Sequence, residues 1–177
     1  MTVEGDRVAL VLVSHSRALA EGVAALARQM VGESVKIVCA AGSGEEGAEL
    51  GTDATRILEA ITVADNPAGT IVFMDLGSAI LSTEMALELA GPELRERVSL
   101  SAAPFVEGAV TAAVAAAGGA ARKAILGEAD RALEPKAQQL EAPVDAAPAR
   151  APAEGATQSV GNPPQHEGAA IADQISP

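Results

Sequence analysis

Four short runs of apolar residues are spaced along the N-terminal part of the chain. They are residues 8–13 (VALVLV), 35–40 (VKIVCA), 70–74 (TIVFM) and 98–101 (VSLS). The first run contains no polar residue, which is typical of a strand buried on both faces of a parallel sheet. Each of the four runs is therefore predicted to be a β-strand.

Helical periodicity occupies the segments between these runs. In the first segment, Leu19, Val23, Leu26 and Met30 stand four, three and four positions apart, which predicts one apolar helical stripe. Helices are predicted at residues 16–30, 52–61, 77–89, 106–117 and 128–140.

The alternation of strands and helices determines the expected fold class. Successive parallel strands need a helical crossover, and those crossovers cover the faces of the sheet. The chain is therefore expected to form a doubly wound α/β domain, with a mainly parallel four-stranded sheet and helices on both faces.

The amino-acid composition of the chain changes after residue 141. Residues 142–177 consist mostly of Ala, Pro, Gly, Gln and Glu, without apolar periodicity. Such a segment cannot bury enough surface to offset the entropy of ordering it. We therefore expect one folded domain at 1–141, followed by a disordered linker or tail at 142–177.

Composition and charge disfavour several classes of binding partner and of cellular location. The formal net charge of −12 disfavours binding to nucleic acid or to an anionic membrane. The longest uncharged Ala-rich run, residues 108–121, is shorter than the roughly 20 apolar residues of a membrane span. Glu4 and Asp6 stand where a secretory signal carries basic residues, so a cytoplasmic protein is expected. Cys39, the only cysteine, lies in an apolar run and is expected to be a buried thiol.

The candidate catalytic residues come directly after predicted strands. In open α/β sheets the ligand crevice lies at the carboxyl ends of the strands. His15 follows the first predicted strand and Asp75 follows the third, so a carboxylate can hold one imidazole nitrogen while the other attacks. A phosphoryl group on His15 would find backbone or hydroxyl donors at helix starts. The candidate phosphate-binding residues are Ser14, Ser16, Gly77 and Ser78.

Plainer interpretations exist for each of these residues. A lone histidine after a strand often serves as a structural hydrogen bonder, and Asp75 or Thr52 could each simply cap a helix. The glycine-rich segment 42–51 lacks the Lys-Ser/Thr pair of a P-loop. The second histidine, His166, lies in the expected tail, so no metal site is predicted.

Four motifs in order resemble a known family. VSHS at 13–16, GTD at 51–53, MDLGSA at 74–79 and APFVEGA at 103–109 are similar to the mannose-type enzyme IIA domain in the phosphotransferase subunits of bacterial dihydroxyacetone kinases. The similarity spans roughly residues 7–135. It implies that His15 is a phosphohistidine nucleophile and that Asp75 is its partner.

The resemblance also implies the reaction and the partners. Such a phosphotransferase subunit takes its phosphoryl group from the carrier protein HPr, and ultimately from phosphoenolpyruvate. It passes the group to ADP on a nucleotide-binding kinase subunit, which acts with a dihydroxyacetone-binding subunit. No cofactor is then expected on this chain, whereas ADP/ATP and Mg²⁺ belong to the partner kinase subunit. Homodimerisation is usual in the family.

Two alternatives remain at this stage. A mannose-type sugar transporter IIA domain shares the fold and the histidine, but it usually has Gly-Gly-Thr/Ser-Pro after the aspartate, where this chain has Leu76-Gly77-Ser78-Ala79. A non-catalytic regulatory domain of the same fold is the other alternative. Some members of the family continue past a linker into an HPr-like domain, so HPr arrives in trans here or the chain is truncated before that domain.

Overall fold

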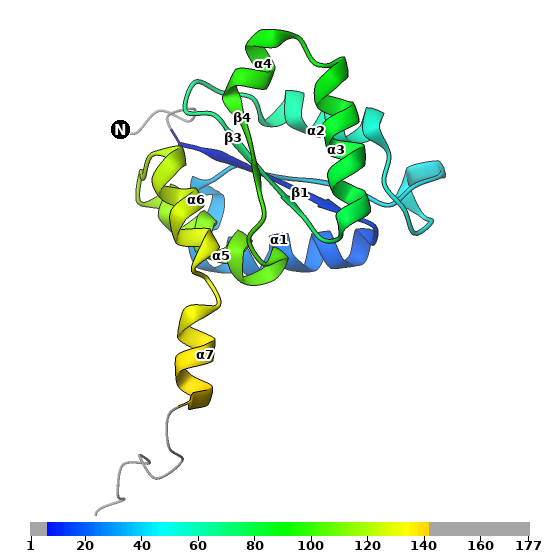
Figure 1. Cartoon of the computed structure of the whole chain (residues 1–177). Helices are drawn as coiled ribbons and strands as arrows, with labels where there is room; N and C mark the ends of the chain where they lie inside the picture. The colour runs from blue at the N-terminus through cyan, green and yellow to red at the C-terminus, as the bar shows by residue number, and fades with distance from the viewer. Residues whose placement is uncertain (1–6, 142–177) are drawn as a thin grey trace, which may run out of the picture. The chain divides into compact units, whose positions relative to one another are not determined.

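The computed structural model describes residues 7–141 and places a four-stranded sheet at their centre (Figure 1). All three strand pairs are parallel, and the spatial order of the strands is β2-β1-β3-β4. The strands are β1 (Ala9–Ser14), β2 (Ile37–Ala41), β3 (Thr70–Met74) and β4 (Val98–Ser101). The tail predicted at 142–177 lies outside the described residues.

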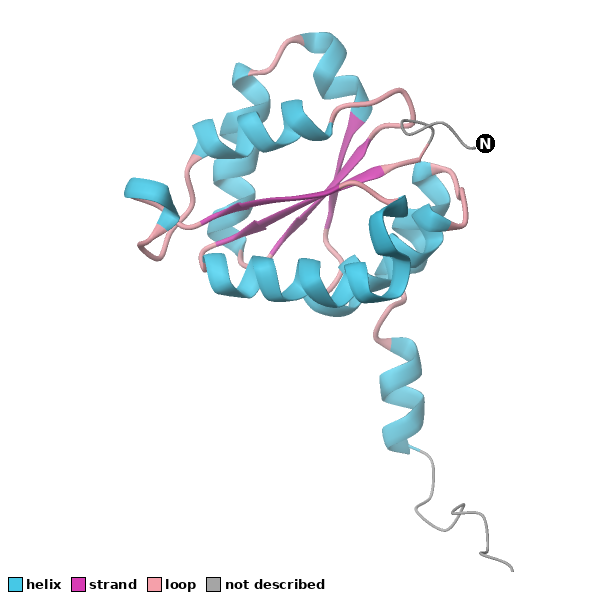
Figure 2. Cartoon of the chain, turned by 180° about the vertical axis from the view of Figure 1, so that it is seen from behind, coloured by secondary structure: helices cyan, strands magenta, loops and turns pink. Residues whose placement is uncertain are grey.

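Helices cover both faces of this sheet (Figures 1 and 2). One apolar cluster joins α1, α5 and α6 to one face, and a second joins α2 and α3 to the other. The predicted doubly wound α/β fold is therefore confirmed. The α-helices are α1 (Arg17–Val31), α2 (Ala54–Ala64), α3 (Gly77–Leu89), α4 (Pro92–Arg97), α5 (Phe105–Ala117), α6 (Arg122–Asp130) and α7 (Glu134–Glu141), and two short 3₁₀ turns are η1 (Gly32–Ser34) and η2 (Glu45–Gly47).

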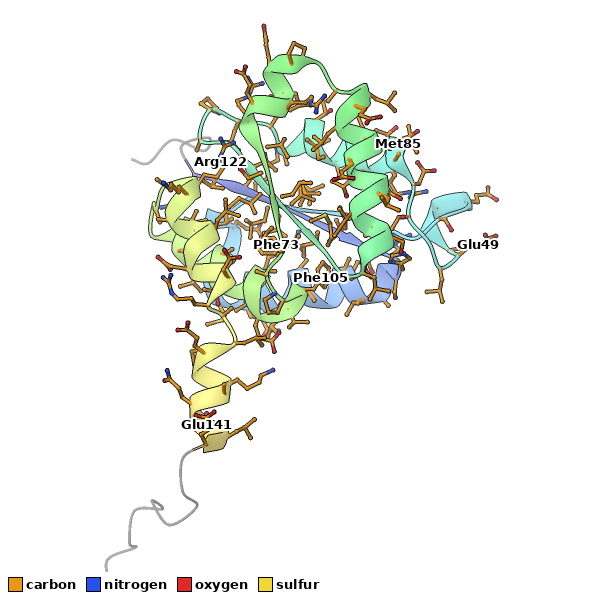
Figure 3. All side chains as sticks on the ribbon, in the orientation of Figure 1. Glu49, Phe73, Met85, Phe105, Arg122 and Glu141 are labelled. Carbon is orange, nitrogen blue, oxygen red and sulfur yellow. The ribbon has the colours of Figure 1, made fainter. Side chains whose placement is uncertain are left out.

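The central position of β1 explains its uninterrupted apolar sequence. Leu10 and Leu12 belong to the cluster with α1 and α5, whereas Val11 and Val13 belong to the cluster with α2 and α3. Because successive side chains of a strand point to opposite faces, both sets must be apolar. Phe73 of β3, also fully buried, faces α5 (Figure 3).

The expected apolar stripe of the first helix is wrong at three of its four positions. Leu19, Leu26 and Met30 are 42%, 45% and 62% exposed. The helix turns a face of small residues to the core instead, and α5 presents a similar face to the same cluster. Small side chains let two helices approach closely. The buried face of α1 is therefore the one that permits close packing, and not the one with the largest apolar side chains. The buried residues of α1 are Ala20, Val23, Ala24 and Ala27, and those of α5 are Gly108, Ala109, Ala112, Ala113 and Ala116.

The C-terminal helix expected at 128–140 is not continuous. A turn at residues 131–133 separates α6 from α7. Helix α6 buries Ile125 and Ala129, whereas α7 buries none of its residues. Only α6 therefore belongs to the core. Among residues 7–141, no helix combines the length and apolar character that a bilayer crossing requires.

Candidate functional site

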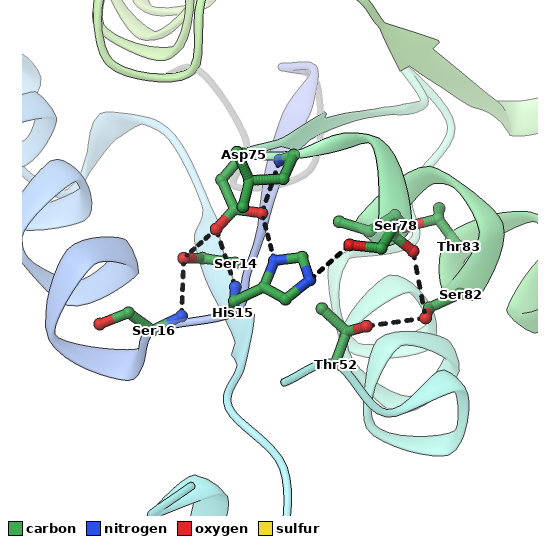
Figure 4. A network of polar contacts seen from close by, with 10 residues as sticks. Ser14, His15, Ser16, Thr52, Asp75, Ser78, Ser82 and Thr83 are labelled. Carbon is green, nitrogen blue, oxygen red and sulfur yellow. Dashed lines mark hydrogen bonds and ion pairs between the residues drawn. The ribbon is translucent and has the colours of Figure 1, made fainter. Parts of the chain in front are cut away.

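The sheet topology creates a crevice between β1 and β3. The chain leaves β1 for β2 on one side and later returns to β3 on the other side, so the crossover helices lie on opposite faces. Carboxyl ends of parallel strands open into a crevice at such a switch point. His15 directly follows β1 and Asp75 directly follows β3, and the structure brings the two side chains together there (Figure 4).

The imidazole of His15 has one nitrogen held by Asp75. Nδ1 lies 2.9 Å from Oδ1, and the backbone N–H of His15 donates to Oδ2 at 2.8 Å. A carboxylate only accepts hydrogen bonds, so in the neutral imidazole Nδ1 carries the ring proton and Nε2 has the lone pair. The His15 side chain is 23% exposed and that of Asp75 only 8%, so the histidine is reachable while its partner is shielded.

Asp75 accepts two further hydrogen bonds. The hydroxyl of Ser14 donates to Oδ2 at 2.9 Å, and the backbone N–H of Leu76 donates to Oδ1 at 2.7 Å. Burial acts to raise the pKa of the Asp75 carboxyl, but the hydrogen bonds from His15 and Ser14 outweigh it and lower the pKa below its ordinary value. Asp75 is therefore an anion at neutral pH and can balance positive charge on the ring.

The other ring nitrogen faces a different environment. The hydroxyl of Ser78 lies 2.7 Å from Nε2. Helix α3 begins there, and its N-cap residue, Leu76, has no side chain that can accept from the first backbone N–H groups. A Cβ added to Gly77 would meet nothing within 4 Å, so there is open space beside this helix start. Donors and space for an anion therefore lie on the Nε2 side.

The predicted phosphate-binding residues fall into two groups. Ser78 lies on the Nε2 side, and Gly77 directly precedes it as the first residue of α3. Ser14 instead donates to Asp75 and accepts from the backbone N–H of Ser16 at 3.1 Å. The hydroxyl of Ser16 accepts from the N–H of Leu19 at 3.3 Å and caps α1. Phosphate binding stays a prediction for all four, and for Ser14 and Ser16 the geometry provides another function.

Two hydroxyl residues near the site were not predicted as part of it. Thr52 Oγ1 and Ser82 Oγ lie 2.7 Å apart, beside His15 and Ser78 (Figure 4). The suggestion that Thr52 caps the second helix is wrong, because Asp53 caps α2 through the N–H groups of the next residues at 2.8 and 3.1 Å. The GTD motif was a signal for Thr52, whereas Ser82 had none in the sequence.

A separate cavity lies at the β2 edge, with a volume of about 490 Å³. Its two arginines and two glutamates balance one another, and Arg17 is already engaged by Glu21 at 2.7 Å. Burial raises the pKa of the half-buried Cys39 thiol there, which keeps it protonated at neutral pH. This cavity offers no nucleophile. Its lining residues are Arg17, Glu21, Cys39, Ala41, Glu46 and Arg56.

Comparison with known proteins identifies the family of this chain. A family model described as the PTS system fructose IIA component matches residues 9–126. The phosphoryl donor subunits DhaM of the PEP-dependent dihydroxyacetone kinases of Providencia stuartii and Escherichia coli are 47% and 48% identical over 134 and 137 residues. These matches cover 75% and 77% of this chain, which spans only 28% and 29% of those relatives.

Shorter relatives match over nearly their whole length. The phosphoryl donor subunit DhaM of PEP-dependent dihydroxyacetone kinase 2 from Listeria innocua is 43% identical over 121 residues, which are 68% of this chain and 95% of that protein. The crystal structure of EF1359, a protein of unknown function, is 33% identical with a TM-score of 0.63 and covers 71% of this chain and 94% of its own. The family model and the Listeria relative together show that this chain belongs to the EIIA-man family.

Proposed function

We propose that this chain is the phosphocarrier subunit of a dihydroxyacetone kinase. His15 accepts a phosphoryl group from HPr and passes it to ADP on a nucleotide-binding kinase subunit. The observation that carries the proposal is the His15–Asp75 pair, in which Asp75 holds Nδ1 while Nε2 faces a hydroxyl at the start of a helix. The names of the Providencia, Escherichia and Listeria relatives support the choice of kinase.

The proposed reaction is a phosphotransfer with a phosphohistidine intermediate. The Nε2 lone pair forms the bond to phosphorus while the bond between phosphorus and the donor breaks and its electron pair returns to the donor. The proton on Nδ1 stays in place, because the Asp75 carboxylate accepts from it throughout. Catalysis of this kind consists mainly of positioning and charge stabilisation. Delivery to ADP is the same step in reverse, with a phosphate oxygen of ADP as the nucleophile.

The proposed partners are proteins. They are HPr as donor, the nucleotide-binding subunit that carries ADP or ATP with Mg²⁺, the dihydroxyacetone-binding subunit, and a second copy of this chain. Exposed apolar side chains near the site support docking of a protein: Leu76 and Leu81 are 61% and 67% exposed. Further along α3, Met85 projects outward at 57% exposure (Figure 3).

One second function is favoured by a specific observation. The family model takes its description from a sugar-specific IIA component, so a role in a sugar transport system is the alternative. In that case His15 would pass the group to a transporter IIB domain and not to ADP. A regulatory domain would accept the group and pass it to neither acceptor.

The test is intact-protein mass spectrometry after incubation with phosphoenolpyruvate, enzyme I and HPr. Wild type is expected to gain one acid-labile phosphoryl adduct, and His15→Ala none. His166→Ala is the matched control, since it removes the only other histidine of the chain. An adduct on His15→Ala would refute the assignment. A chase with the ADP-loaded kinase subunit is then expected to remove the label, and label that stays would refute the kinase role.

A further inference from the structure

Three hydroxyl groups gather on one side of the His15 ring. Figure 4 places Ser78, Ser82 and Thr52 on the Nε2 side, opposite Asp75 and Ser14. Ser78 Oγ is 2.7 Å from Nε2, and Ser82 Oγ is 2.7 Å from Thr52 Oγ1. The ring is therefore flanked by an acceptor carboxylate on one nitrogen and by potential donors on the other.

Within the described part of the chain, the hydroxyls of Ser82 and Thr52 make no strong hydrogen bond to the backbone that would hold them in place. Ser82 donates to the carbonyl of Ser78 only at 3.5 Å, at the limit of a hydrogen bond. The next residue, Thr83, makes the same kind of bond to Ala79 at 2.7 Å and is fully buried, which is a structural contact. Thr52 is not used to cap α2, because Asp53 does so. The Ser82 and Thr52 hydroxyls can therefore turn toward a ligand.

The backbone holds Thr52 close to the nucleophile. The N–H of Gly51 donates to the carbonyl of His15 at 3.0 Å, so the residue before Thr52 is tied to His15 itself. A Cβ at Gly51 would lie 2.5 Å from the hydroxyl oxygen of Ser43, so no other residue fits this approach without displacing that side chain. Thr52 thus has a defined place beside the ring.

We propose that Thr52 and Ser82 complete, together with Ser78, a cradle of three hydroxyls that binds the phosphoryl oxygens on His15 Nε2. This inference rests on the proposed function. A phosphoryl group has three acceptor oxygens, which need hydrogen-bond donors. Its negative charge is repelled by the carboxylate of Asp75. On phosphorylation, the Ser78 hydroxyl turns from the nitrogen and donates to a phosphoryl oxygen. The hydroxyls of Ser82 and Thr52 donate to the other two oxygens.

The experiment measures the equilibrium of phosphoryl exchange between phospho-HPr and the full chain. Thr52→Val and Ser82→Ala are each expected to keep labelling at His15 but to shift the exchange constant about tenfold toward HPr, because a hydroxyl that donates to a charged group is worth about that much. Thr52→Ser is expected to restore the constant. Thr62→Val is the control, because the Thr62 hydroxyl donates to the carbonyl of Leu58 within α2 at 2.8 Å.

Two further measurements separate binding from structure. The isolated phosphoproteins are expected to show a changed ³¹P chemical shift for Thr52→Val and Ser82→Ala, at an unchanged melting temperature. Exchange constants within twofold of wild type for both variants would overturn the cradle, while labelled wild type would leave the proposed function standing. Wild type that takes no label at His15 would overturn both. Ser82→Ala carries the test alone if Thr52→Val fails to fold, because alanine suits a helix interior.

Discussion

Replacing Asp75 by asparagine tests the proposed carrier site most directly. The two carboxylate oxygens of Asp75 accept four hydrogen bonds, from Ser14, from the backbone and ring of His15, and from Leu76. An asparagine of the same shape has only one acceptor oxygen, and its amide group donates. Whichever way the side chain turns, two of the four donors then face another donor.

Each orientation damages the site in its own way. With the amide nitrogen toward the ring of His15, Nδ1 must become the acceptor, so Nε2 takes the proton and loses the lone pair that attacks phosphorus. With the amide nitrogen toward Ser14, the ring keeps its tautomer but loses the negative charge that balances phosphoimidazole. Hydrogen bonds to a charged group are worth about 1.5–3 kcal/mol each. The loss of one such bond to a backbone N–H, together with the wrong tautomer or the missing charge, predicts transfer slowed on the order of 100-fold or more.

The assay is rapid-quench transfer from phospho-HPr, with Asp75→Ala measured beside Asp75→Asn. Asp75→Ala is expected to slow transfer without abolishing it, because Nε2 still has an unprotonated form. Rates within threefold of wild type in both variants would refute the role of Asp75 in orienting the ring and balancing its charge.

The stability of the site has a pH dependence of known sign. The folded pKa of Asp75 lies below its unfolded value, so the ionised group stabilises the fold above about pH 4. That contribution is lost as the pH falls through the folded pKa. The difference in free energy of unfolding between wild type and Asp75→Asn is therefore expected to shrink as the pH falls below about pH 4. A difference that grows on acidification would contradict the assigned hydrogen bonds.

Three further substitutions concern helix stability and packing. Ser16→Ala is expected to lower the free energy of unfolding by about 1 kcal/mol, through loss of the α1 cap, while His15 is labelled at the wild-type rate; slowed labelling at unchanged stability would instead make Ser16 a phosphate ligand. Gly108→Ala is expected to destabilise by about 1–3 kcal/mol in urea unfolding, because its Cβ would lie 2.8 Å from that of Ala103. Gly22→Ala, with nothing within 4 Å, should stabilise α1 by about 0.5–1 kcal/mol, and equal effects of the two alanines would refute the packing argument.

The sequence by itself determined the order of the elements and the class of the fold. The uninterrupted apolar run at residues 8–13 is typical of a strand covered on both sides, and helices between parallel strands act as crossovers. Residues placed directly after those strands must then share one edge of the sheet. For this reason the pairing of His15 with Asp75 could be predicted from position alone, although 60 residues separate them along the chain.

Only the tertiary structure decided which face of α1 is buried. Periodicity favoured Leu19, Leu26 and Met30 because they are large, but the face toward α5 had room only for alanines and one valine. The segment expected as one helix at 128–140 likewise falls into two parts, of which α6 packs on the core and α7 buries nothing. Which face of a helix is buried depends on the element that packs against it. The sequence of the helix alone does not specify that element.

The division of roles between the two ring nitrogens also needed the folded chain. A histidine in sequence has two equivalent candidates for the nucleophile, and only the 2.9 Å contact with Asp75 distinguishes Nδ1 from Nε2. Likewise Thr52 and Ser82 come from separate elements and approach to 2.7 Å only when α3 packs beside the loop before α2. Such contacts depend on side-chain geometry at a junction of elements, which no local pattern specifies.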